Sequence, residues 1–216
     1  MTKCKKDLEQ IEQWLKKNAK KIYQHSLNQP ASQEQLNELE ILIGGNLPND
    51  FKVLYQWHNG LNHDKNFGSL FYGYDFWDLN KVIEHYKSNL DDKEYRSDVV
   101  SYLDDFDKEI NPQGFIDNPK WIQFTHDGSR TGFYLDLNSS EHGHYGQVIF
   151  IDFDYNVAFI VANSVADLIK QVNADMQAGH YQLNEDALED GNHYLEVDRE
   201  IDILNHHSSE RWKRQE

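Results

Sequence analysis

The chain has 216 residues and a formal net charge of −16, from 37 acidic and 21 basic residues. This charge repels nucleic acid and anionic membranes, so neither is expected as a partner, whereas a basic protein would be attracted. The single cysteine, Cys4, excludes an internal disulfide, the charged N-terminus does not look like a signal peptide, and no apolar stretch is long enough to span a bilayer, so we expect a cytoplasmic protein.

The N-terminal segment predicts a long amphipathic helix over about residues 5–26, because apolar residues recur there at helical spacing between charged ones. The apolar positions are Cys4, Leu8, Ile11, Leu15, Ala19 and Ile22. The first 25 residues also carry seven Lys against three acids, which is the reverse of the overall charge balance.

Two further helices are predicted before residue 60. Ser32 and Gln35 are spaced as a capping box at the start of the first, and Gly44-Gly45 ends it. Pro48 suits the first turn of the second helix, which ends at His58-Asn59-Gly60.

The middle of the chain is less regular. After a loop over 61–69, residues 70–74 are a candidate short strand, and Asp78 can cap the helix that follows. Residues 91–118 are polar and rich in acids, so we interpret them as a surface insertion, with a helical turn around 99–106.

A series of strands is predicted from residue 121 onwards, at 121–124, 132–137, 147–153 and 157–162. The third is apolar on both faces, as a central strand is, and a turn at 154–156 makes it a hairpin with the fourth. Ser164 then caps a final helix, and the acidic chain after Gly179 is expected to pack loosely against the rest.

Three blocks in this order resemble the SUKH superfamily, also called the Smi/Knr family, over about residues 30–175. The first block is Gly45, Leu47, Pro48, Phe51, Tyr55, His58, Asn59 and Gly60. The second is Trp121, Phe124, Asp127, Gly128, Leu135, Asp136 and Leu137. The third is Gly146, Gln147, Val148, Ala162 and Ser164.

The resemblance implies an α+β fold in which a central, largely antiparallel sheet is flanked by helices. We therefore expect an N-terminal helix and linker at 1–29, a SUKH-like domain at 30–178 and an acidic C-terminal extension at 179–216. Family-motif residues are expected to have structural roles. They are Pro48, Phe51, Tyr55, Asn59, Gly60, Trp121, Asp127, Gly128, Asp136, Gly146 and Ser164.

Bacterial members of this family resemble immunity proteins that neutralise toxins, often nucleases or deaminases, and fungal members resemble intracellular scaffolds or regulators of cell-wall synthesis. Our main hypothesis is an immunity protein that binds a basic toxin, since an acidic inhibitor would be steered to it. The candidate contact acids are Glu94, Asp98, Asp104, Asp105, Asp107 and Glu109. The candidate contact aromatics are Phe67, Phe71, Tyr72 and Tyr74.

An enzymatic alternative rests on Asp152 and Asp154, which follow an apolar strand as in magnesium-dependent phosphoryl or glycosyl transferases. Two acids at a hairpin turn explain the pattern more simply, because Asp is favoured in turns. The pairs His142/His144 and His206/His207 lack the cysteines and the four-ligand pattern of a zinc site, and Cys4 falls on a buried stripe. We therefore assign no catalytic residue, metal ligand or cofactor.

Overall fold

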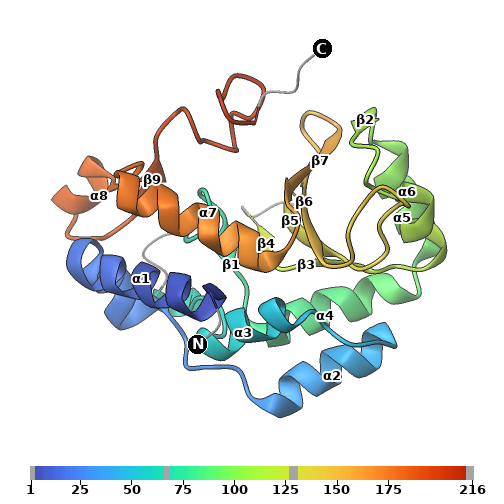
Figure 1. Cartoon of the computed structure of the whole chain (residues 1–216), viewed down its shortest axis with the longest axis horizontal. Helices are drawn as coiled ribbons and strands as arrows, with labels where there is room; N and C mark the ends of the chain where they lie inside the picture. Colours follow the sequence, from blue (N-terminus) through green and yellow to red (C-terminus); the bar gives the residue numbers. More distant parts are fainter. Residues whose placement is uncertain (1–2, 66–68, 127–130, 213–216) are drawn as a thin grey trace.

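The computed structural model describes residues 3–65, 69–126 and 131–212. A five-stranded sheet lies at its centre, with helices on both faces (Figure 1). In spatial order its strands are β2 (Asp105–Phe106), β7 (Val157–Ala162), β6 (Gln147–Asp152), β5 (Gly132–Asp136) and β3 (Trp121–Gln123). Only the β2–β7 pair is parallel, so the predicted α+β fold with a largely antiparallel sheet is confirmed.

The hairpin predicted from the apolar run is the centre of this sheet. Every residue of β6 is buried, which explains why its sequence is apolar on both faces. Asn156 adopts a left-handed conformation with φ of +56° in the turn, and β7 returns antiparallel to β6. β3 joins the same sheet through β5, as expected.

One face of the sheet packs against helices that share a single large core. These helices are α1 (Lys3–Asn18), α2 (Gln33–Ile43), α3 (Asn49–Trp57), α4 (Leu79–Leu90) and α7 (Val165–Ala178). The predicted signals hold: Ser32 and Gln35 form the capping box, Asp78 caps α4 and Ser164 caps α7. The N-terminal helix is shorter than predicted, because α1 ends at Asn18 and a π-helical turn, η1 (Ile22–Ser26), follows.

The segment 70–74 is a tight turn, so its prediction as a strand was wrong. Tyr72 and Gly73 have φ of +50° and +92°, a left-handed region that interrupts extended backbone. The turn is closed by the Tyr74 amide, which donates to the Phe71 carbonyl at 2.9 Å. The strand begins after it, as β1 (Asp75–Phe76), and pairs with β4 (Thr125–His126).

Residues 91–118 cover the second face of the sheet, so the interpretation of a mere surface insertion was wrong. They form α5 (Lys93–Ser101), the edge strand β2 and α6 (Pro112–Asp117). Their apolar side chains Val99, Leu103, Ile110 and Phe115 pack with Trp121, Tyr134, Ile149, Ile151 and Ala158. The insertion therefore supplies a second core.

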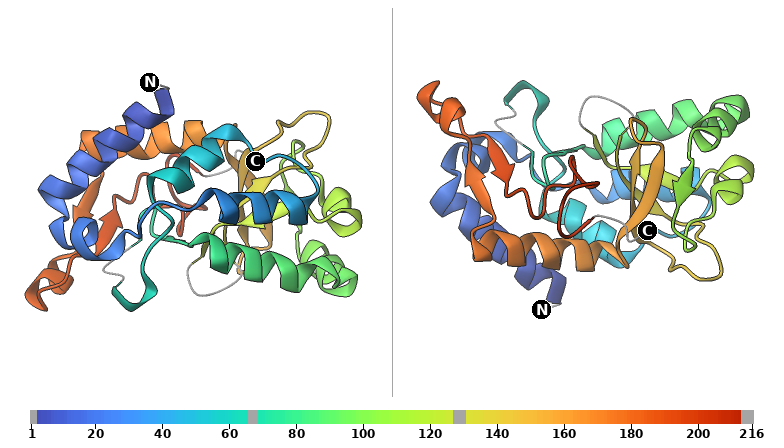
Figure 2. Two further views of the ribbon diagram at one scale, coloured as in Figure 1. Left: turned by 90° about the horizontal axis from the view of Figure 1, so that it is seen from below. Right: turned by 90° about the horizontal axis from the view of Figure 1, so that it is seen from above.

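Parts of the C-terminal extension pack into the main core, more closely than expected. It forms a hairpin of β8 (Tyr181–Leu183) and β9 (Leu195–Val197) around α8 (Glu185–Glu189). Residues 199–212, which we call the strap, then run above α7 towards the sheet (Figure 2). Ile201, Ile203 and Trp212 of the strap are buried in the main core. The division of the chain at residues 29 and 178 stays a prediction.

Candidate functional site

The outer side of α5 carries acidic and aromatic side chains in one row. Asp92 caps the helix by accepting from the Tyr95 amide at 2.7 Å, and Val99 faces the second core. Glu94, Asp98 and Tyr102 then follow at intervals of four, which places them on one side of the helix, and all three are exposed.

Basic residues of α5 are engaged elsewhere. Arg96 is buried and donates to the backbone carbonyls of Asn89, Leu90 and Ile116 at 2.7–3.1 Å. Lys93 pairs with Asp117 at 3.0 Å. The acids on the outer side of α5 therefore keep a negative field toward solvent.

The row continues into β2, where Asp104, Asp105 and Phe106 are exposed. Hydrogen bonds to the β6–β7 turn hold this end: the Asp104 amide donates to the Asn156 carbonyl at 2.8 Å, and the Asn156 side chain donates to the Asp104 carboxylate at 3.1 Å. Phe106 and Tyr102 leave 42% and 52% of their surface exposed, so both rings are accessible to a partner. We call Glu94, Asp98, Tyr102, Asp104, Asp105 and Phe106 the acidic stripe.

Asp107 and Glu109, predicted with these acids, are placed differently. The Asp107 carboxylate accepts a hydrogen bond from the Ile160 amide of β7 at 2.8 Å. It thus continues the pairing with β7 just after β2 ends. Glu109 is half-buried, and its carbonyl accepts from Ser140 and Gln147. Asp107 and Glu109 are partly buried against the sheet, whereas the other four acids are exposed, Asp104 with a hydrogen bond from Asn156.

Three of the four candidate contact aromatics are buried. Phe71, Tyr72 and Tyr74 are each at most 1% exposed and pack around Phe76, Phe133 and Phe150. Their assignment as contact residues was therefore wrong, because they belong to the main core. Phe67 lies outside the described residues.

Asp152 and Asp154 do not converge on a common point. The Asp152 carboxylate accepts from the amides of Asp154 and Tyr155 at 2.8 and 3.2 Å, and its other oxygen lies 3.1 Å from His206 Nε2. Burial raises the pKa of Asp152, but the contact with His206 and the two amides outweigh it, so the pKa is lowered. Asp154 is exposed at the turn. In the described part of the chain, no three His, Cys, Asp or Glu side chains gather as metal ligands would.

The remaining chemical candidates also have other surroundings. His142 and His144 are exposed on a loop, and His207 stacks on Tyr155 with ring centroids 4.7 Å apart. Cys4 is buried, which raises the pKa of its thiol to about 11 and leaves it protonated at neutral pH.

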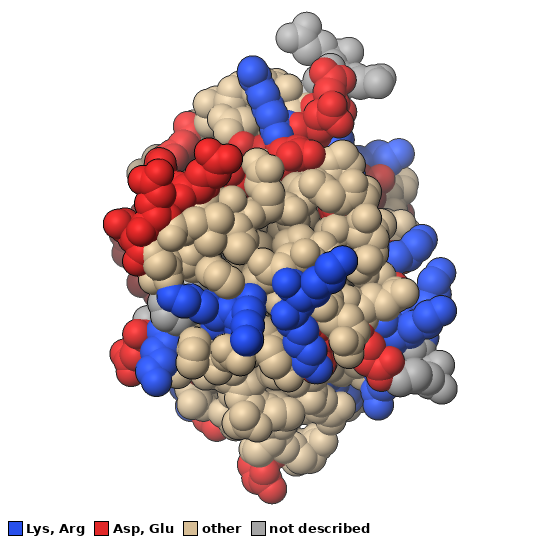
Figure 3. Space-filling model, turned by 90° about the vertical axis from the view of Figure 1, so that its left-hand side faces the viewer, with Lys and Arg blue, Asp and Glu red and all other residues tan. Residues whose placement is uncertain are grey.

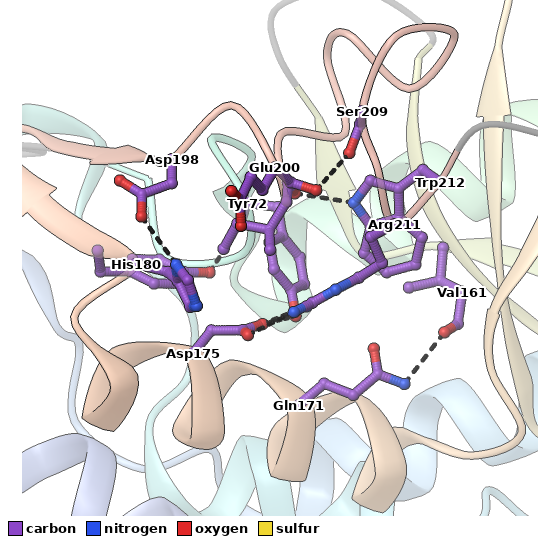
Figure 4. Close-up of polar contacts among 12 residues, drawn as sticks. Tyr72, Val161, Gln171, Asp175, His180, Asp198, Glu200, Ser209, Arg211 and Trp212 are labelled. Carbon is purple, nitrogen blue, oxygen red and sulfur yellow. Dashed lines mark hydrogen bonds and ion pairs between the residues drawn. The ribbon is translucent and has the colours of Figure 1, made fainter.

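A polar cluster that sequence reasoning missed joins the strap to α7 (Figure 4). Arg211 donates to both oxygens of the buried Asp175, at 2.5 and 2.7 Å, and Tyr72 donates to the same carboxylate at 2.7 Å. Burial raises the pKa of Tyr72 far above its ordinary value, so its hydroxyl stays neutral. The cluster therefore holds matched charges and no activated nucleophile, and its arrangement anchors the strap. Its only signal in the sequence was the position of Asp175 on the buried side of α7.

The motif residues near the start of α4 make backbone contacts. Asn59 accepts from the Leu79 amide at 2.8 Å, and the Tyr55 hydroxyl donates to the Trp77 carbonyl at 3.0 Å. Gly60 has φ of +70°, and a Cβ there would lie 2.3 Å from the Asp78 nitrogen, so only glycine fits. Phe51 is fully buried beside Tyr55.

The other motif residues pack along the sheet. Trp121 stacks on Phe115 of α6 with ring centroids 4.5 Å apart, and Pro48 lies against Gly146. Burial raises the pKa of Asp136 to about 6, although it accepts from the Asn138 amide and the Gln147 side chain. Asp127 and Gly128 lie outside the described residues.

Comparison with known proteins places this arrangement in a family. The model of the SMI1 / KNR4 family (SUKH-1) matches residues 30–171. The chain is 21% identical over 213 residues to a Neurospora crassa "Glucan synthesis regulatory protein", covering 84% of the chain and 40% of that protein. It is 25% identical over 191 residues to the Schizosaccharomyces pombe "Cell wall biosynthesis/cell cycle regulator smi1", covering 82% and 36%.

A third relative, the Saccharomyces cerevisiae "Cell wall assembly regulator SMI1", is 22% identical over 207 residues, covering 82% of the chain and 40% of that protein. The chain thus spans about two fifths of the length of these relatives. They are named as regulators. Within the described ranges, no helix is long and apolar enough to cross a membrane.

Proposed function

Because the chain belongs to the SMI1/KNR4 family (SUKH-1), we propose that it is a non-catalytic protein-binding domain, and that it acts as an immunity protein that neutralises a basic toxin by direct contact. The acidic stripe carries this proposal. It combines four exposed carboxylates with two exposed rings, Tyr102 and Phe106, on one end of the molecule.

The composition of the stripe fits a protein partner. Aromatic rings supply contact area at low entropic cost, and they are enriched in protein interfaces. Carboxylates around them attract a basic surface and orient it before contact, which mainly raises the association rate. A toxin that acts on nucleic acid has such a basic surface, because its substrate is a polyanion.

The proposal includes the absence of catalysis. The groups with the chemistry for it are engaged otherwise: Asp152 in the turn and with His206, Asp175 with Arg211, and Cys4 in the core as a neutral thiol. A function as an intracellular regulator or scaffold of cell-wall synthesis is a second candidate, favoured by the names of the fungal relatives. Both functions require a protein partner.

The experiment captures the partner from the native host with the tagged chain and then measures its binding and toxicity. We expect a basic protein whose expression alone arrests growth and whose co-expression with the chain does not. A captured partner that is harmless alone and acts in wall synthesis would favour the regulator instead.

The contact surface is tested by neutralising the exposed acids, with Glu94→Gln, Asp98→Asn, Asp104→Asn and Asp105→Asn combined. Association with the purified partner should slow by about tenfold or more at low salt, and the gap should close as salt rises, since screening acts beyond roughly 8 Å at physiological ionic strength. A matched control also neutralises four acids, Glu185, Asp186, Glu189 and Asp190, which are exposed in and next to α8. Equal rates for the parent and the stripe variant at low salt would remove the stripe as the contact surface.

A further inference from the structure

α1 and the last turn of α7 lie at the end of the molecule opposite α5 (Figure 1). Their side chains line an open groove of about 430 Å³. We call it the α1–α7 groove. Two turns of α1 supply Gln10, Gln13, Trp14 and Lys17, and α7 supplies Met176 and Gln177.

The groove has firmly placed walls. α1 buries Leu8, Ile11 and Leu15 in the main core, so its opposite stripe is fixed in orientation. Under the groove, the buried Asn173 of α7 donates to Asp7 at 3.0 Å and to Gln10 at 2.8 Å. These bonds tie the two helices together, and no preorganising movement is needed to form the groove.

The lining has the chemistry of a peptide-binding groove. The partly exposed Trp14 gives an apolar contact above the buried Met176, and its ring is held against Tyr181 with centroids 6.4 Å apart. The side-chain amides of Gln13 and Gln177 can both donate to and accept from a peptide backbone. Lys17 adds a positive charge at the edge.

The charges around the groove are segregated. Lys17 and Lys20 are exposed at the end of α1 and just after it, while Glu185, Asp186 and Glu189 are exposed on α8. Figure 3 shows this face, with lysines gathered across its middle and acids in an arc above them. The acids border the lysines closely, which leaves too small a basic area for a nucleic acid or a membrane surface.

From this arrangement we propose that the α1–α7 groove docks a short segment of a partner protein that carries an apolar side chain between acidic residues. The apolar side chain packs against Trp14, and the carboxylates face Lys17 and Lys20. The acids of α8 repel the segment in the reverse placement, so they help to set its direction. The two ends of the molecule then select partners of opposite charge, which lets the chain bridge them.

The test uses the full chain and two synthetic probes. Both are 12-residue helical peptides with Leu at every third or fourth position. One has Glu at all flanking positions, and the other has Lys there. Binding is followed by the NMR signals of the Trp14 indole and of the Gln13 and Gln177 side-chain amides. We expect the Glu peptide to shift these signals, with an affinity that falls as salt rises, and the Lys peptide to leave them unchanged.

Two charge reversals on α1 separate the groove from general attraction. Lys17→Glu should weaken binding of the Glu peptide at least tenfold. Lys5→Glu makes the same change on the side of α1 that faces α3, and it should alter the affinity less than twofold. Equal weakening by both variants, equal shifts with both peptides, or a Trp14 signal that does not move at saturating peptide would overturn the proposal. None of these results bears on the acidic stripe at the other end.

Discussion

The insertion at 91–118 and the C-terminal extension after residue 179 look alike in sequence, since both are acidic and both carry scattered apolar residues. They cover the sheet from opposite sides, and they are held by different forces. The insertion packs through an apolar core around Trp121 and Phe115. The strap of the extension also buries apolar residues, and in addition its polar side chains contact buried carboxylates: Arg211 with Asp175, and His206 with Asp152.

This difference affects how each region should respond to mutation and pH. A segment held by apolar packing loses stability when volume is removed, and it is insensitive to salt. A segment held by buried ionic contacts is sensitive to the loss of one partner, because the other charge is then left buried alone. In both regions, segments rich in acids also bury apolar side chains, so a high density of acids does not by itself indicate a segment that packs loosely.

The largest loss of stability is expected in the second core, where the insertion is held by apolar packing. Trp121 is only 3% exposed and stacks on Phe115. Trp121→Ala should lower the free energy of unfolding by about 3–5 kcal/mol through the cavity it leaves. Urea unfolding measures this loss, and the exposed Tyr102→Ala serves as a control that should change stability by less than about 0.5 kcal/mol. An unchanged Trp121→Ala midpoint would contradict the second core.

Removing the ionic contact of the strap is expected to lower the stability of the protein somewhat less. Arg211→Ala leaves the Asp175 carboxylate buried without its cation, which should cost about 2–3 kcal/mol, below the cost of a fully buried pair because Arg211 is 32% exposed. Adding Asp175→Asn should restore part of the loss, since the amide carries no charge. If the double variant is no more stable than Arg211→Ala, the ionic contact is not what holds the strap.

The two regions should also differ in their pH dependence. Asp136 lies beside Gln147, which binds the insertion through the Glu109 carbonyl, and its pKa is raised to about 6 by burial. An unfolded Asp ionises near pH 4, so the stability that the neutral carboxyl contributes is complete below that pH and is lost as the pH rises towards 6. Asp136→Asn should remove this loss. The difference in the free energy of unfolding between the variant and the parent should therefore change by up to about 3 kcal/mol between pH 4 and pH 7.

Asp152, which contacts the strap, should behave in the opposite way. Its pKa is lowered, so its contribution to stability is present above about pH 4 and is lost as the pH falls through the folded pKa. Urea unfolding of Asp152→Asn from pH 7 down to pH 3 should therefore show a flatter acid limb than the parent. If the free energy of unfolding varies with pH in the same way for the parent, Asp136→Asn and Asp152→Asn, the two carboxyls do not have these opposite effects.

The smallest effects separate the acids of the insertion from one another. Asp107→Ala removes the acceptor of the Ile160 amide and should cost about 1–2 kcal/mol. Asp98→Ala, on the exposed side of α5, should stay within about 0.5 kcal/mol. Thermal unfolding of the two variants side by side would test this, and equal midpoints would mean that Asp107 has no structural role.

Features that depend on neighbours along the chain could be predicted from the sequence. The capping box at Ser32, the caps at Asp78 and Ser164, the end of α2 at Gly44 and the β6–β7 hairpin follow from local hydrogen bonding and from apolar periodicity. The resemblance of three ordered motif blocks was sufficient for the family and for the class of fold.

Contacts between segments far apart along the chain determine which acids face solvent and where the two acidic regions pack. Asp104 and Asp107 stand three residues apart with the same side chain, yet one lies exposed and the other completes the edge of β7. The same holds for Asp175, whose partner Arg211 is 36 residues away, and for Tyr72, which is buried by a strap that no local pattern links to it. Burial and pairing depend on segments that meet only after folding, so a local charge pattern could not predict them.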